Sequence, residues 1–131
     1  MSNPETKEVT TKMNLHISIL GKEDAIYLGR DVIRGLNNPK YIKILVSKNY
    51  DKLLFAPCKE MEPMSFKVPE DLSKQHTEVR IYSKAFVREV LAKNGFKENG
   101  THKFFGQYLD QQLAIVFPLV VRNYENGAVA E

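Results

Sequence analysis

The sequence predicts an α+β, β-rich fold in which two tandem strand-helix-hairpin units pack into one domain of a 131-residue chain. The first observation is internal similarity, since short segments recur in the same order: Ile26-Tyr27 and Val32-Ile33-Arg34, then Ile81-Tyr82 and Phe86-Val87-Arg88. The second is that segments 41–57 and 102–118 both end in an apolar run closed by proline. One unit has too few elements to bury both faces of its hairpin. We therefore expect the two units to pack about a pseudo-twofold axis.

The first unit is expected to begin with a half-buried strand, because Leu15, Ile17 and Ile19 alternate with polar residues. An extended segment at 25–28 then leads into a helix that ends at Asn37-Asn38-Pro39. The apolar face of this helix contains Val32, Ile33 and Leu36. A hairpin follows, in which 41–47 pairs with 50–56 across Lys48-Asn49.

The second unit repeats these elements from an extended segment at 79–82 onward. Ser83 is expected to be the N-cap of its helix and Gly95 the residue that ends it. The apolar face of this helix contains Phe86, Val87 and Val90. A hairpin is then expected between 102–108 and 112–117 across Asp110. Glycine within a strand often marks a bulge, which is the interpretation of Gly106.

The domain is expected to span residues 14–122, with the units at 14–57 and 78–118. The connector 58–77 contains a predicted edge strand at 64–68, and segments 1–13 and 123–131 are expected to be flexible tails. The only cysteine, Cys58, excludes a disulfide within the chain and is expected to be a small buried apolar residue. No run of 18 apolar residues and no signal-peptide pattern is present, so we expect a cytoplasmic protein with no membrane contact.

The order of elements in 14–57, repeated in 78–118, resembles the AbrB and MraZ family of bacterial DNA-binding proteins. This resemblance implies a barrel made from two interleaved copies, and both copies lie in one chain in MraZ-like members. The family places a glycine-arginine pair before the first extended segment and a proline before the helix. Here Glu23-Asp24 and Leu28 are closest to those positions, and carboxylates there would repel phosphate. In the second copy Arg80 lies near the equivalent place.

The chain is also similar to small proteins encoded beside recombinases in mobile elements of Gram-positive bacteria. That similarity implies an origin on a mobile element or phage, and it implies no activity.

Repeated basic residues are the main indication of DNA binding, because the net charge of +3 is only mildly positive. Arg30 and Arg34 share one face of the first helix, and Lys84 and Arg88 occupy the same positions in the second. Two such faces related by a pseudo-twofold axis would match the dyad symmetry of a DNA duplex. The alternative is an ordinary solvated helix face. A separate pair, Tyr27 and Tyr82, occupies equivalent positions and is a candidate contact for a base or a protein, or else part of the core rim.

The sequence contains no pattern typical of an enzyme, a metal site or a cofactor site. Gly21 and Gly29 do not have the spacing of a phosphate-binding loop, and His16, His76 and His102 have no partners at metal-ligand spacing. We therefore expect a non-enzymatic, DNA-binding, transcription-regulator-like protein. Two alternatives stay open: a protein-binding module that acts as an inhibitor or adaptor of a host machine, and a small-molecule sensor. A monomer, a homodimer and a higher ring are all compatible with two internal copies.

Overall fold

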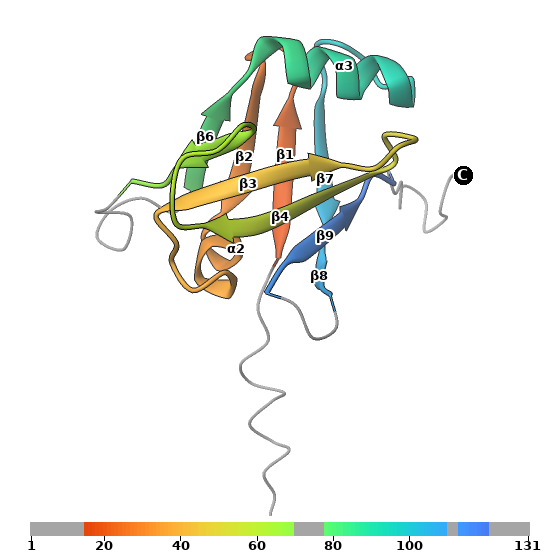
Figure 1. Cartoon of the computed structure of the whole chain (residues 1–131). Helices are drawn as coiled ribbons and strands as arrows, with labels where there is room; N and C mark the ends of the chain where they lie inside the picture. Colours follow the sequence, from red (N-terminus) through yellow and green to blue (C-terminus); the bar gives the residue numbers. More distant parts are fainter. Residues whose placement is uncertain (1–14, 70–77, 110–112, 121–131) are drawn as a thin grey trace, which may run out of the picture.

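The computed structural model describes residues 15–69, 78–109 and 113–120, which form two antiparallel sheets and two helices. Sheet A has the strand order β6 (Glu78–Tyr82), β2 (Ala25–Gly29), β1 (His16–Leu20), β7 (Thr101–Phe105). Sheet B has the order β5 (Ser65–Lys67), β3 (Tyr41–Val46), β4 (Lys52–Cys58), β9 (Ile115–Pro118), β8 (Gln107–Tyr108). Helices α2 (Arg30–Gly35) and α3 (Lys84–Asn94) lie at opposite ends of the strands of sheet A (Figure 1). The predicted α+β, strand-rich class is confirmed, and in the described residues the strands form two separate sheets rather than a closed barrel.

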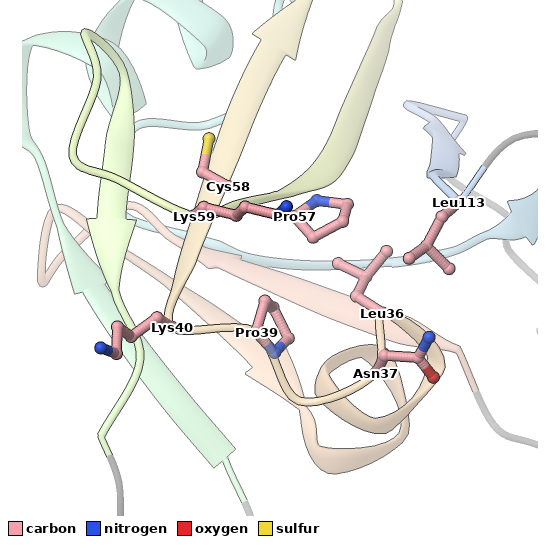
Figure 2. A pocket seen from close by; sticks show the side chains of 8 residues that line it. All are labelled: Leu36, Asn37, Pro39, Lys40, Pro57, Cys58, Lys59 and Leu113. Atoms are coloured by element: carbon pink, nitrogen blue, oxygen red, sulfur yellow. The ribbon is translucent and has the colours of Figure 1, made fainter.

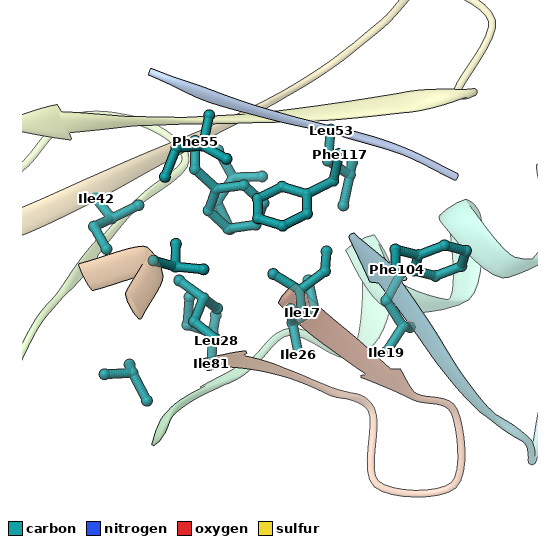
Figure 3. Packing of buried hydrophobic residues seen from close by; sticks show 14 of the residues in the cluster. Ile17, Ile19, Ile26, Leu28, Ile42, Leu53, Phe55, Ile81, Phe104 and Phe117 are labelled. Atoms are coloured by element: carbon teal, nitrogen blue, oxygen red, sulfur yellow. The ribbon is translucent and has the colours of Figure 1, made fainter. Parts of the chain in front are cut away.

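The core lies between the two sheets, and the alternation of β1 explains why. Ile17 and Ile19 are fully buried, while the alternating residues His16, Ser18 and Leu20 are half-buried, as the sequence pattern predicts. Figure 3 shows Phe55 and Phe117 of sheet B above Ile17 and Ile26 of sheet A. The two phenylalanine rings meet edge to face at 5.2 Å between centroids, a favourable geometry for aromatic pairs. Interdigitation of the two inner faces therefore holds the sheets together.

Both helices occupy the positions that the sequence predicts. In α2 the residues Val32 and Ile33 are buried, and α3 buries Val87, Val90 and Leu91. Gly95 ends α3 in the left-handed conformation with φ 70°, which confirms its predicted role. Ser83 is the N-cap residue, as predicted, although its side chain makes no capping hydrogen bond. Its backbone N–H instead donates to the carbonyl of Asp24 at 3.0 Å, which connects α3 to the β1–β2 turn.

The first hairpin is confirmed, but its turn is longer than predicted. β3 pairs with β4 from Tyr41 opposite Cys58 to Val46 opposite Leu53. The hydroxyl of Ser47 accepts hydrogen bonds from the backbone N–H groups of Asp51 and Lys52, each at 3.0 Å. The hydrogen bonds to the Ser47 hydroxyl close a loop that is longer than the predicted two-residue turn Lys48-Asn49. The second strand of the hairpin therefore begins at Lys52.

The second predicted hairpin is wrong for most of its length. Residues 102–108 do not form one strand: β7 pairs with β1 in sheet A, while only β8 pairs with β9 in sheet B. The chain changes sheets at Gly106, whose N–H donates to the carbonyl of Leu15 at 2.9 Å. This explains the glycine that the sequence pattern marked as a bulge. Asp110 and Gln112 lie outside the described residues.

The predicted edge strand in the connector is confirmed as β5, which pairs with β3. Its pairing follows a pattern also found in the first unit. β1, which precedes β2 in the chain, pairs with β7, the strand after the second helix. In the same way β5, which precedes β6, pairs with β3, the strand after the first helix. The segment 58–77 thus begins with the last residue of β4 and contributes a strand to sheet B. Segments 1–13 and 123–131 lie outside the described residues.

Replacing Gly106 with alanine is expected to lower the free energy of unfolding by about 1–3 kcal/mol, the usual range for overpacking a core. A β-carbon there would be 2.6 Å from the Phe117 ring and 2.8 Å from the carbonyl oxygen of Val116. Urea unfolding followed by circular dichroism measures the change. The matched control is Gln107→Ala at the next, exposed position, expected within about 0.5 kcal/mol of the parent. Equal stability of the two variants would contradict the close packing at the sheet corner.

Candidate functional site

The outer face of sheet A, turned away from the core, carries both aromatic and basic side chains. We use the term outer face for six residues: Ser18, Tyr27, Arg80, Tyr82, Lys103 and Phe105. The strand register places Arg80 opposite Tyr27, Tyr27 opposite Ser18, and Ser18 opposite Lys103, so one row crosses all four strands. Because side chains alternate along a strand, all six point to the same side of the sheet.

Arg80 is the centre of a cluster on the β2–β6 pair. Its guanidinium lies over the ring of Tyr27, 4.2 Å from the ring centroid, and donates a hydrogen bond to the hydroxyl of Tyr82 at 2.6 Å. Glu23 accepts from the Tyr27 hydroxyl at 3.5 Å and forms an ion pair with Arg80 at 3.6 Å. Three sequence candidates that two separate arguments selected, Tyr27, Arg80 and Tyr82, therefore meet in one place. Tyr82 remains 61% exposed, so its ring is accessible to a ligand.

A second cation–aromatic pair lies on β7 at the opposite edge of sheet A. The ammonium of Lys103 is 5.6 Å from the ring centroid of Phe105, which is 57% exposed. The sequence interpretation missed both residues, because it placed β7 inside a longer hairpin strand. The alternation of Thr101, Lys103 and Phe105 with the buried Phe104 is the signal that would have located them.

The basic residues of the helices lie at the two ends of the β2–β6 pair. Arg30 directly follows the last residue of β2, and Lys84 comes two residues after the end of β6. Since β2 and β6 are antiparallel, these two helix starts are at opposite ends of the pair. Arg34 is exposed and is 3.9 Å from Asp31, while Arg30 is half-buried. The four helical residues do not form one cluster.

Arg88 has a structural contact that the sequence did not indicate. Its Nε atom donates to the carboxylate of Asp24 at 3.0 Å, and its guanidinium is 3.9 Å from Glu98. The ion pair joins α3 to the β1–β2 turn, across 64 residues of sequence. The acidic pair Glu23-Asp24 thus binds two of the candidate arginines, Arg80 and Arg88.

Arg88→Gln is expected to lower the free energy of unfolding by about 0.5–1 kcal/mol at low salt, because it removes a partly exposed ion pair. Screening should shrink this difference as the salt concentration rises. The control is Lys84→Gln on the same helix, since Lys84 is exposed and forms no ion pair within the described residues. Chemical unfolding at two salt concentrations tests the pair, and an equal loss in both variants would contradict a structural role for Arg88.

Other candidate chemistries are limited in the described part of the chain. Cys58 is buried, as predicted, and burial raises the pKa of its thiol, with a further contribution from Glu62. Within residues 15–69, 78–109 and 113–120, no three His, Cys, Asp or Glu side chains are grouped to hold a metal ion. Neither helix in these ranges has the length and apolar character needed to cross a membrane.

Comparison of the chain with models of protein families, with curated proteins and with solved structures gave no match.

Proposed function

We propose that this protein is a non-enzymatic, transcription-regulator-like protein that binds double-stranded DNA through the outer face of sheet A. The observation that carries the proposal is the row of cations and exposed aromatic rings on a sheet face to which each unit contributes two strands. Arginine and lysine bind phosphates and base edges, while polar and aromatic side chains add contacts to the sugar and backbone. The resemblance to the AbrB and MraZ family agrees with this proposal.

The proposed pseudo-twofold relation between the units is supported by two strand pairings. β2 pairs with β6 so that Ile26 faces Ile81, the residue that occupies its place in the second unit. β4 pairs with β9 so that Leu54 faces Val116 and Phe55 faces Ile115, which are neighbouring positions of the two aligned apolar runs. A twofold axis through both pairings would place the outer face of the β2–β6 pair on the axis, where it can match a DNA dyad.

The spacing of the basic residues is compatible with a duplex groove. A five-residue strand spans about 17 Å, so Arg30 and Lys84 flank the outer face at a separation of that order. The major groove is about 12 Å wide. Cations at both ends of the β2–β6 pair can therefore reach phosphates on the two sides of one groove, with Arg80 between them.

The ion pairs of Glu23 and Asp24 favour a second candidate function, a module that binds a protein of the host. These carboxylates neutralise part of the charge that phosphate binding needs. Exposed tyrosine, phenylalanine and arginine side chains are also typical of protein interfaces. The two candidates differ in salt dependence, because phosphate contacts weaken steeply as salt rises and apolar interfaces do not.

Duplex binding is tested by fluorescence anisotropy with random DNA and with DNA from the protein's own promoter, at several salt concentrations. The double variant Arg80→Gln, Lys103→Gln should reduce the slope of log K against log salt by about 2, because each lost phosphate contact removes about 0.9. At about 0.1 M salt, each contact then corresponds to roughly tenfold in affinity. In a second variant Arg30, Arg34 and Lys84 are all replaced by glutamine. Its change in the salt slope gives the contribution of these helical residues to DNA binding.

The matched control is Lys48→Gln, an exposed lysine in the β3–β4 turn of sheet B, which should leave the slope unchanged. Equal effects of Lys48→Gln and of the Arg80→Gln, Lys103→Gln double variant on the slope would remove the outer face from the proposal. No duplex binding at low salt would contradict DNA binding and leave the protein-binding candidate.

A further inference from the structure

A hollow of about 500 Å³ lies beside sheet B, away from the outer face. It is bounded by the turn after α2, by the end of β4 and by the segment before β9. Figure 2 shows Leu36 and Leu113 on one side and the rings of Pro39 and Pro57 nearby, while the Cys58 thiol points away from them. A volume of this size falls in the range of pockets that hold small organic ligands, about 300–1,000 Å³.

The walls of the hollow are apolar and largely rigid. Pro39 and Pro57 have few rotatable bonds, and Leu36 is fully buried in the core, so these side chains lose little freedom when a ligand binds. Leu113 is 44% exposed at the margin, and its partial exposure leaves apolar surface that a ligand can cover. The hollow therefore favours an apolar body over a polar one.

The charged residues at its margin are all basic. Lys40 and Lys59 contribute to the lining, and both are exposed. The nearby Lys43 differs from them, because it forms an ion pair with Glu62 at 2.7 Å, which raises its pKa through a hydrogen bond and charge attraction. Within the described residues neither Lys40 nor Lys59 has an ion pair of this kind, so their charges are available to a ligand. An ammonium is a strong hydrogen-bond donor to a carboxylate.

We infer that this hollow binds a small organic anion with an apolar body, specifically a carboxylic acid with an alkyl chain or ring. The apolar body covers Pro39, Pro57 and Leu113, and the carboxylate lies at the margin near Lys40 or Lys59. This binding site is separate from the outer face and does not depend on nucleic-acid binding. It gives the protein a small-molecule ligand in addition to its proposed macromolecular partner.

Occupancy is measured as the ligand-induced rise in melting temperature, because a ligand that binds only the folded state stabilises it. The melting temperature is measured with octanoate, octylamine or octan-1-ol, three probes with the same chain and different charges. Octanoate should raise the melting temperature in a saturable manner, octanol should act only at higher concentration, and octylamine should have no effect. An equal rise with octylamine would overturn the inference, and so would the absence of a rise with octanoate.

Two substitutions at the exposed Leu113 test the charge preference at one position. Leu113→Lys should tighten octanoate binding and Leu113→Glu should weaken it, each by about twofold to fivefold, as expected for exposed charges. The ligand-induced rise in melting temperature also gives the octanoate affinity of each variant. Equal octanoate affinity in both variants, in a fold that circular dichroism shows unchanged, would overturn the inference even if octanoate stabilises the parent protein.

Discussion

The pairing of β2 with β6 is the interaction on which the rest of the structure depends. It joins the first half of the chain to the second, with Ile26 opposite Ile81 and both side chains in the core. A slip of one residue in this register would turn Tyr27 and Arg80 inward and expose the isoleucines, because side chains alternate between the faces of a sheet. The apolar core thus selects the register, and the register in turn determines which polar side chains share a surface.

The position of the helices explains why a large sheet face is left open. α2 directly follows β2, and α3 begins two residues after β6, so both helices lie at the strand ends and bury their apolar residues beside the core (Figure 1). The outer face then keeps large rings in contact with solvent. Arg80 and Lys103 lie over these rings, and such cation–aromatic contacts stabilise exposed sites by about 0.5–1 kcal/mol each.

Local patterns in the sequence predict most of the individual elements, but not how the second unit divides between the sheets. Alternation locates β1, and apolar spacing locates both helices. The break at Gly106 depends on its packing against Phe117, a contact that no local pattern contains. The same holds for the candidate site: Tyr27, Arg80 and Tyr82 can be chosen from the sequence, but their meeting depends on the β2–β6 register. The hollow depends on three segments, so no single stretch of sequence indicates it.

The long sequence separation between paired strands has a consequence for synthesis on the ribosome. β4 is synthesised early, but its neighbour β9 begins only at Ile115. In the same way, β1 cannot pair with β7 until the chain has been synthesised beyond Phe105. At about 5–20 residues per second, the inner side of the first half remains uncovered for several seconds after it has been translated. During that interval Leu53 and Phe55 are exposed to other nascent chains and to chaperones. Pauses in translation between β4 and β9 would lengthen this exposure, so the speed of decoding in that part of the message affects the yield of folded protein.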